Sequence, residues 1–93
     1  MKEDHPHYKE LLEKLAELEH EQWMKWASVI MRYEKLTQDR VNRWNSLMVP
    51  YSQLTESSKE HDREWARKII PIIADECIQI FKIATEAIFG LKS

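Results

Sequence analysis

The chain has 93 residues and a formal net charge of −2, and 43% of the residues are hydrophobic. This length fits one small domain, and the apolar content is too high for a disordered chain. The near-neutral charge excludes the basic surface with which proteins gather nucleic acid, and the single glycine leaves little room for turn-rich β structure.

The first predicted helix begins near Pro6 and extends to about residues 31–33. Proline suits the first turn of a helix, because the N–H that it lacks would be unbonded there. Apolar residues follow at spacings of one, three, four or seven, which places them on one helical face. The residues on this face are Tyr8, Leu11, Leu12, Leu15, Ala16, Trp23, Trp26, Ala27 and Ile30.

Two polar residues, Glu19 and His20, disturb this apolar face. Glu19 projects near its centre, and burying a carboxylate without a partner is costly. In one interpretation Glu19 pairs with an arginine of a neighbouring helix, and in the other it is a polar group inside a ligand pocket. His20 lies at the edge of the face, one turn before Trp23.

A second helix of about 11 residues is predicted to start at Thr37, whose hydroxyl suits an N-cap. Trp44 lies on its apolar side. Pro50 stops this helix, because the residue before a proline avoids the helical region. A compact turn follows, and Thr55 is the expected N-cap of the third helix.

The third predicted helix continues to about residue 70, with Trp65 on its inner side. Asp62 points the same way by helical phase, so it needs a buried partner. We expect Asp62 to bond the start of another segment or an arginine such as Arg40 or Arg43.

A basic stripe runs along this third helix, formed by Lys59, Arg63 and Arg67 at one-turn spacing. Such a stripe is either a solvated edge, whose long side chains keep their charges in water, or an anion clamp. The tryptophans of the chain also allow two interpretations, as core packing or as an aromatic box around a planar ligand.

The C-terminal segment is unusually apolar. We expect Pro71 to kink the helix rather than end it, and Gly90 to cap its C-terminus. Two adjacent apolar lines run along it: Ile70, Ile73, Cys77, Phe81, Ala84 and Ile88, and Ile69, Ile72, Ile80, Ile83 and Ala87. A bundle of this size can cover one line, and an exposed second line marks an interface. We therefore expect a homodimer or small homo-oligomer built on residues 70–91.

No residue pattern indicates catalysis. A glycine-rich phosphate loop, a C-x-x-C pair and a paired-histidine motif are all lacking from the sequence, so we expect no enzyme, cofactor or metal site. Cys77 has an apolar setting that is typical of an inert core thiol. A single cysteine, a polar N-terminus and charges within the C-terminal apolar run favour a cytoplasmic protein without a membrane span.

Two blocks of sequence carry a family resemblance. The first is L-A-E-x-x-H-x-x-W, from Leu15 to Trp23, and the second is V-P-Y-x-x-L-x-E-x-x-K-x-x-D-R, from Val49 to Arg63. Both resemble the repeat domain of ryanodine receptors, called the RyR domain. The resemblance covers about residues 11–70 and leaves an additional C-terminal helix at about 71–89. The family's central G-W-x-Y-G block is absent.

The resemblance implies a helical module and a small bacterial or phage protein. It also implies that the H-x-x-W face holds an adenine-nucleotide-like ligand, with Trp23 stacking on the base and His20 beside it. Trp44 would substitute for the aromatic wall of the missing block.

Together these observations predict one all-α domain over residues 1–93, a small bundle of three to four helices with a long first helix and a proline-kinked C-terminal helix. The predicted function is a non-enzymatic binding module for a nucleotide-like small molecule. The alternative is a protein-interaction or oligomerisation module without such a ligand. In the first case Glu19 and His20 would hydrogen-bond the ligand, and Lys59 or Arg63 would meet a phosphate. The predicted ligand-binding residues are Glu19, His20, Trp23, Trp44, Lys59 and Arg63.

Overall fold

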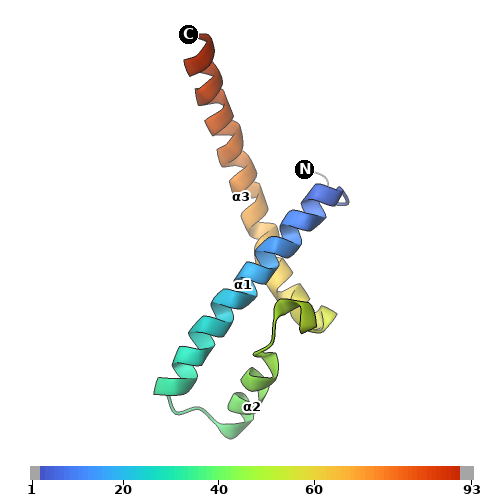
Figure 1. Ribbon diagram of the computed structural model, residues 1–93, viewed down its shortest axis with the longest axis vertical. Coiled ribbons are helices and arrows are strands. Elements are labelled where there is room, and N and C mark those ends of the chain that lie inside the picture. Colours follow the sequence, from blue (N-terminus) through green and yellow to red (C-terminus); the bar gives the residue numbers. More distant parts are fainter. Residues whose placement is uncertain (1–2, 91–93) are drawn as a thin grey trace.

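The computed structural model describes residues 3–90 and shows three α-helices (Figure 1). The helices are α1 (Pro6–Tyr33), α2 (Gln38–Leu47) and α3 (Glu56–Phe89), and a short 3-10 turn, η1 (Tyr51–Gln53), lies between α2 and α3. No strand occurs within residues 3–90. The predicted all-α class is therefore confirmed.

The helix ends follow local side-chain chemistry. Pro6 occupies the start of α1, as predicted. The hydroxyl oxygens of Thr37 and Thr55 accept hydrogen bonds from the backbone N–H groups of Arg40 and Ser58, which caps α2 and α3. Gly90 closes α3 with a φ of 59°, a left-handed conformation that glycine adopts without steric cost.

The third helix does not break at proline. It is 34 residues long in all, and Pro71 lies inside it. Proline removes only one backbone hydrogen bond of the helix, and the Ile70 side chain could not cap a new helix. The segment after Pro71 is thus part of α3, and residues 3–90 form three α-helices rather than four.

The core lies where α1 and α3 cross (Figure 1). Ala16 of α1 and Ala66 of α3 are completely buried, and their small side chains let the two helices approach closely. The turn η1 closes one side of the crossing. The buried core residues are Tyr8, Leu12, Ala16, Tyr51, Leu54, Ala66 and Ile70.

The oblique crossing limits how much of α3 is covered. Trp65, predicted on the inner side, is 58% exposed and lies under the Lys68 ammonium, which is 4.5 Å from the ring centroid. That prediction is wrong, because α1 crosses α3 instead of lying along it. Ala66 and Ile70 are therefore the buried apolar residues of α3 at the crossing with α1.

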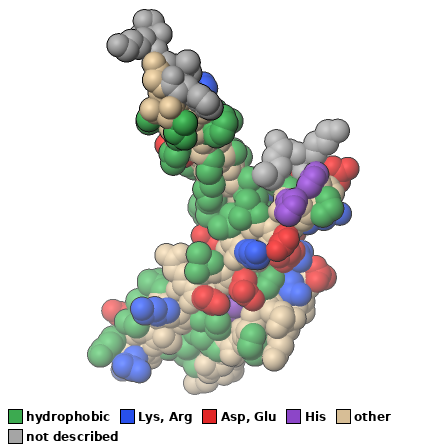
Figure 2. Space-filling model, turned by 45° about the horizontal axis from the view of Figure 1, so that its top comes forward, with side chains coloured by type: hydrophobic (Ala, Val, Ile, Leu, Met, Phe, Trp, Pro, Cys, Tyr) green, Lys and Arg blue, Asp and Glu red, His purple; other side chains and the backbone are tan. Residues whose placement is uncertain are grey.

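Beyond Ile70, α3 projects away from α1, and the molecule is 64 Å long (Figures 1 and 2). Its large apolar side chains are 40–76% exposed: Ile72, Ile73, Ile78, Ile80, Phe81, Ile83 and Ile88. Cys77 is exposed as well. The expectations that one apolar line packs within the domain and that Cys77 is a core thiol are both wrong for the single chain, since no other described element reaches this part of α3.

Candidate functional site

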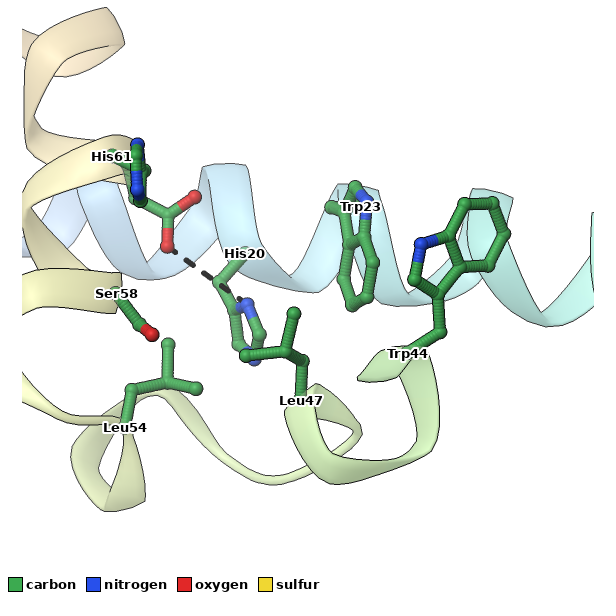
Figure 3. A pocket seen from close by; sticks show the side chains of 8 residues that line it. His20, Trp23, Trp44, Leu47, Leu54, Ser58 and His61 are labelled. Atoms are coloured by element: carbon green, nitrogen blue, oxygen red, sulfur yellow. Dashed lines mark ion pairs between the residues drawn. The ribbon is translucent and has the colours of Figure 1, made fainter. Parts of the chain in front are cut away.

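A pocket of about 280 Å³ lies between α1, α2 and the first turns of α3 (Figure 3). Its lining combines aromatic, aliphatic and polar side chains from all three helices and from the turn before α3. The lining residues are His20, Trp23, Trp44, Leu47, Leu54, Ser58, His61 and Asp62.

One side of the pocket is aromatic. The rings of His20 and Trp23 are nearly parallel, with centroids 6.0 Å apart. Trp44 reaches from α2 and meets Trp23 edge-on, at a centroid distance of 5.9 Å and an angle of 74°. Trp23 and Trp44 are only half-buried, so each presents part of its ring to the pocket.

His20 connects this wall to the loop after α2. Its side chain is buried, and its Nε2 lies 2.7 Å from the carbonyl oxygen of Val49. A carbonyl oxygen can only accept, so Nε2 is the donor in this bond. The bond holds the chain before Pro50 against α1 and fixes the orientation of the imidazole.

The other ring nitrogen of His20 faces Asp62, and the distance between Nδ1 and Oδ2 is 3.9 Å. Burial raises the pKa of Asp62, opposed by His20 and reinforced by the negative charge of Glu19. The prediction that Asp62 points inward is confirmed, but the predicted arginine partners are wrong. Arg43 pairs instead with Asp39 of its own helix, at 3.5 Å.

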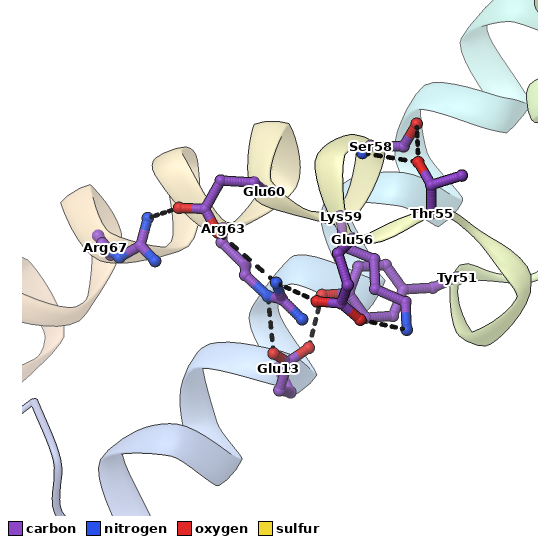
Figure 4. Close-up of polar contacts among 9 residues, drawn as sticks. All are labelled: Glu13, Tyr51, Thr55, Glu56, Ser58, Lys59, Glu60, Arg63 and Arg67. Atoms are coloured by element: carbon purple, nitrogen blue, oxygen red, sulfur yellow. Dashed lines mark hydrogen bonds and ion pairs between the residues drawn. The ribbon is translucent and has the colours of Figure 1, made fainter.

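Lys59 and Arg63 lie on a different side of α3 and do not line the pocket (Figure 4). The Nε of Arg63 donates to Glu13 at 2.7 Å, and its Nη1 donates to Glu56 at 2.9 Å. Lys59 lies 3.5 Å from Glu56 and 5.4 Å from the ring centroid of Tyr51. These two cations are held by carboxylates and an aromatic ring of the same chain, so they are not a solvated edge, and the anion clamp stays a prediction.

The same network anchors η1 to α1. The Tyr51 hydroxyl donates to Oε2 of Glu13 at 2.5 Å, while Arg63 occupies Oε1 of the same carboxylate. Burial raises the pKa of Tyr51, and the hydrogen bond to Glu13 raises it further. Because η1 follows Val49 and Pro50 directly, this network also supports the loop that His20 contacts.

Glu19 is half-buried and does not line the pocket. It makes no ion pair with an arginine in the described part of the chain. Its influence on the site is electrostatic, through the pKa of Asp62.

Of the six predicted ligand residues, the structure brings His20, Trp23 and Trp44 together. Five further lining residues were not proposed as ligand residues: Leu47, Leu54, Ser58, His61 and Asp62. Helical spacing could have found part of this set, because Ser58 lies one turn before Asp62 and shares its face of α3.

No helix within residues 3–90 combines the length and hydrophobicity that a membrane span requires. In the same residues, no three or more histidine, cysteine, aspartate or glutamate side chains are grouped to hold a metal ion.

The crossed helices, the H-x-x-W face on α1 and the V-P-Y turn together agree with a family assignment. The model of the RyR domain family matches residues 5–80, and the chain belongs to this family. The match includes both sequence blocks and continues into α3 beyond Pro71, further than the resemblance predicted from the blocks alone. Neither a curated protein nor a solved structure matches the chain significantly.

Proposed function

We propose that this chain is a non-enzymatic binding module whose pocket holds the planar base of a nucleotide-like small molecule. The observation that carries the proposal is the placement of Trp23 and Trp44, from two helices, at one wall of the pocket. An indole face is a platform on which any nucleobase stacks. His20, Ser58 and Asp62 supply the few polar groups that orient a ligand in such a pocket.

The size of the pocket favours the base over the whole nucleotide. Sites for drug-sized ligands have volumes of about 300–1,000 Å³, and this pocket, at about 280 Å³, lies just below that range. A base fits within it, while the sugar and any phosphate would lie outside.

The charge of the pocket leads to the same choice. Its lining contains the Asp62 carboxylate and no lysine or arginine. A phosphate placed there would meet a negative charge, and the predicted phosphate partners Lys59 and Arg63 are engaged with Glu13 and Glu56 instead. We therefore assign the pocket to the base and give Lys59 and Arg63 no ligand role.

Thermal unfolding with and without nucleosides and nucleotides tests this proposal, because a ligand that binds the folded state raises its stability. Replacing Trp23 with alanine should abolish the shift, since one stacked base contributes about 1–3 kcal/mol. Trp65→Ala is the matched control, because Trp65 is exposed and outside the pocket. Circular dichroism checks that both variants fold. The proposal fails if no compound stabilises the wild type, or if both variants keep the shift.

We also propose that two copies of the chain associate through the projecting part of α3. Asp75, Gln79, Lys82 and Glu86 form a polar stripe along it at spacings of three and four residues, and the polar residues Glu76 and Thr85 lie outside this stripe. Most of the remaining surface is apolar and exposed (Figure 2). An isolated helix of this length is marginal in water without packing partners. A second copy offers the same apolar surface, and two-fold pairing is the commonest closure of identical chains.

The available apolar surface is sufficient for such a pair. Ile72, Ile80 and Ile83 share one face with Glu76 and are 63–66% exposed. Full burial of such a side chain gains roughly 1.5–3 kcal/mol, so covering the exposed 63–66% of these six side chains in the two copies would gain about 6–12 kcal/mol. Association costs an estimated 4–15 kcal/mol, so these residues and their neighbours together could support a dimer.

Sedimentation at micromolar concentration tests the association directly. The wild type should sediment as a dimer or small oligomer, and Ile83→Glu should sediment as a soluble monomer. Lys82→Glu, on the polar stripe, serves as the control and should remain associated. A monomeric wild type would contradict the proposal, and an associated Ile83→Glu variant would exclude this face of α3 from the interface.

A further inference from the structure

The first helix carries a second apolar line, which its own chain covers only in part. Leu18, Trp26 and Val29 are 59%, 54% and 47% exposed, while Leu11 and Leu15 are half-buried against the core. Positions three or four residues apart share one face of a helix. We call this face the α1 line, and Gln22 is its only polar member: Leu11, Leu15, Leu18, Gln22, Trp26 and Val29.

The third helix carries a line with the same spacing, most of it on the projecting part. This α3 line has Glu76 as its only polar member: Ile69, Ile72, Glu76, Ile80, Ile83 and Ala87. Taken from the C-terminal end, its positions are 4, 3, 4, 4 and 3 residues apart, as are those of the α1 line taken from the N-terminal end. Antiparallel pairing of the two lines therefore places Gln22 opposite Glu76 and apolar side chains opposite each other at the other five positions.

The polar centre of each line favours this pairing over the pairing of α3 with itself. A glutamine amide donates hydrogen bonds, so Gln22 can bond the Glu76 carboxylate inside an otherwise apolar seam. A single polar position of this kind fixes the register of paired helices. Two α3 lines paired in parallel would instead bring the Glu76 carboxylates of both copies together, and a carboxylate without a partner is costly to bury.

The charges at the edges of the lines agree with the same register. Helical phase places Lys14 and Lys25 on one edge of the α1 line, 11 residues apart. Asp75 and Glu86 lie on the corresponding edge of the α3 line, also 11 residues apart. Corresponding edges face each other in an antiparallel pair, and charges there set its orientation. Lys25 then lies two residues, about 3 Å, from the position opposite Asp75, and Lys14 lies equally close to the position opposite Glu86.

The acids of α1 on this edge are compatible with the pairing. Glu21 comes near Asp75, but Lys25, one turn further along α1, is close to both carboxylates. Glu17 comes next to Lys82. Opposite charges therefore outnumber like charges along the edge.

We propose that the projecting part of α3 in one copy docks antiparallel on the α1 line of a second copy. The inference rests on the proposed association through α3 and names the surface of the partner that α3 meets. Each copy carries both lines, so two-fold symmetry lets both contacts form together. The dimer would then cover Leu18, Trp26 and Val29 in addition to the three exposed isoleucines of the α3 line, twice as many exposed apolar side chains as self-pairing of α3 covers.

Disulfide cross-linking tests the register. Gln22→Cys and Glu76→Cys are made separately, each with Cys77→Ser so that every chain has one thiol. Mixed at micromolar concentration and oxidised with copper phenanthroline, the two variants should form a disulfide between one chain of each kind, which mass spectrometry identifies. Lys82→Cys in place of Glu76→Cys is the control and should cross-link to Gln22→Cys far less, because Lys82 lies on the polar stripe.

Sedimentation of a variant on α1 tests the docking surface. Leu18→Glu puts a carboxylate into the α1 line opposite Ile80, so the dissociation constant should rise about tenfold or more and the variant should sediment as a monomer. Lys9→Glu adds a carboxylate on another face of α1 and should remain associated. Both residues are exposed, so circular dichroism should show that both variants fold.

Each outcome has a distinct consequence. A disulfide between the Gln22→Cys and Glu76→Cys chains, together with a monomeric Leu18→Glu variant, supports docking on α1. If the wild type associates, then absence of this disulfide, or a Leu18→Glu variant that stays associated, refutes docking on α1 and leaves the association through α3 intact. A monomeric wild type refutes both proposals. The cross-link decides on the docking surface by itself if Leu18→Glu does not fold.

Discussion

The Tyr51 hydroxyl offers a direct test of how η1 is held against α1. Tyr51→Phe removes the O–H that donates to Glu13 at 2.5 Å and leaves the ring in place. The ring is buried, so its packing should be unchanged, and so should its contact with the Lys59 ammonium. The substitution therefore isolates one hydrogen bond.

The size of the effect follows from the surroundings of Glu13. A hydrogen bond to a charged group contributes about 1.5–3 kcal/mol net. The Glu13 side chain is 44% exposed and keeps its bond to Arg63, so water can replace the lost hydroxyl. We therefore expect a loss of about 1.5 kcal/mol. For a domain of this size that lowers the melting temperature by roughly 6–12 °C.

Thermal unfolding followed by circular dichroism, at pH 7 and fixed protein concentration, measures this loss. Tyr33→Phe is the matched control, because Tyr33 is 74% exposed. A Tyr51→Phe variant as stable as the wild type would refute the reasoning. An equal loss in Tyr33→Phe would refute it as well, since the effect would then not come from the bond to Glu13.

The pH dependence of stability provides a second readout of the same bond. Burial first, and then the Glu13 carboxylate, raise the pKa of Tyr51 above its ordinary value of 10.0. The folded state therefore holds the phenolic proton more tightly than the unfolded state. The protonated Tyr51 hydroxyl therefore contributes to the stability of the folded state, fully below pH 10 and progressively less as the pH rises above 10. The wild type should lose more stability than Tyr51→Phe above pH 10.

Two further predictions concern α3. Burial raises the pKa of Asp62 above 3.8, so its contribution to stability is complete below that pH and is lost as the pH rises through the folded-state pKa. Asp62→Asn should consequently melt above the wild type at pH 7, and the difference should shrink as the pH falls toward 3.8; a lower melting temperature at pH 7 would contradict this. Ala66→Leu, at the crossing with α1, should cost about 1–3 kcal/mol through overpacking, measured by urea unfolding. An unchanged unfolding midpoint would show that the crossing is not tightly packed.

The ends of the helices were predictable from the sequence because they depend on neighbouring residues. Thr37 and Thr55 each bond a backbone N–H only three residues away. Pro6 and Gly90 act through their own backbone preferences. None of these signals needs a contact between distant segments. The predicted ends of α1, α2 and α3 therefore lie close to the ends in the structure.

Three of the eight residues that line the candidate site were also predicted: His20, Trp23 and Trp44. His20 and Trp23 are one turn apart on α1, and the spacing places both on the same side of a helix. Trp44 was placed beside them only as a substitute for the family's missing aromatic residue, and the structure brings it to Trp23. The partner of Asp62 was not predictable, since several polar residues of other segments were equally compatible with its inward phase.

Only the tertiary structure decided which faces of α3 are covered. Periodicity identifies the apolar side of a helix, but burial depends on where a neighbouring helix runs. Because α1 crosses α3 obliquely, Ala66 and Ile70 are buried while Trp65 stays exposed. The same crossing directs Arg63 toward Glu13 rather than toward the pocket. Past Ile70 no described element accompanies α3, so an apolar pattern that resembles a core becomes an exposed surface.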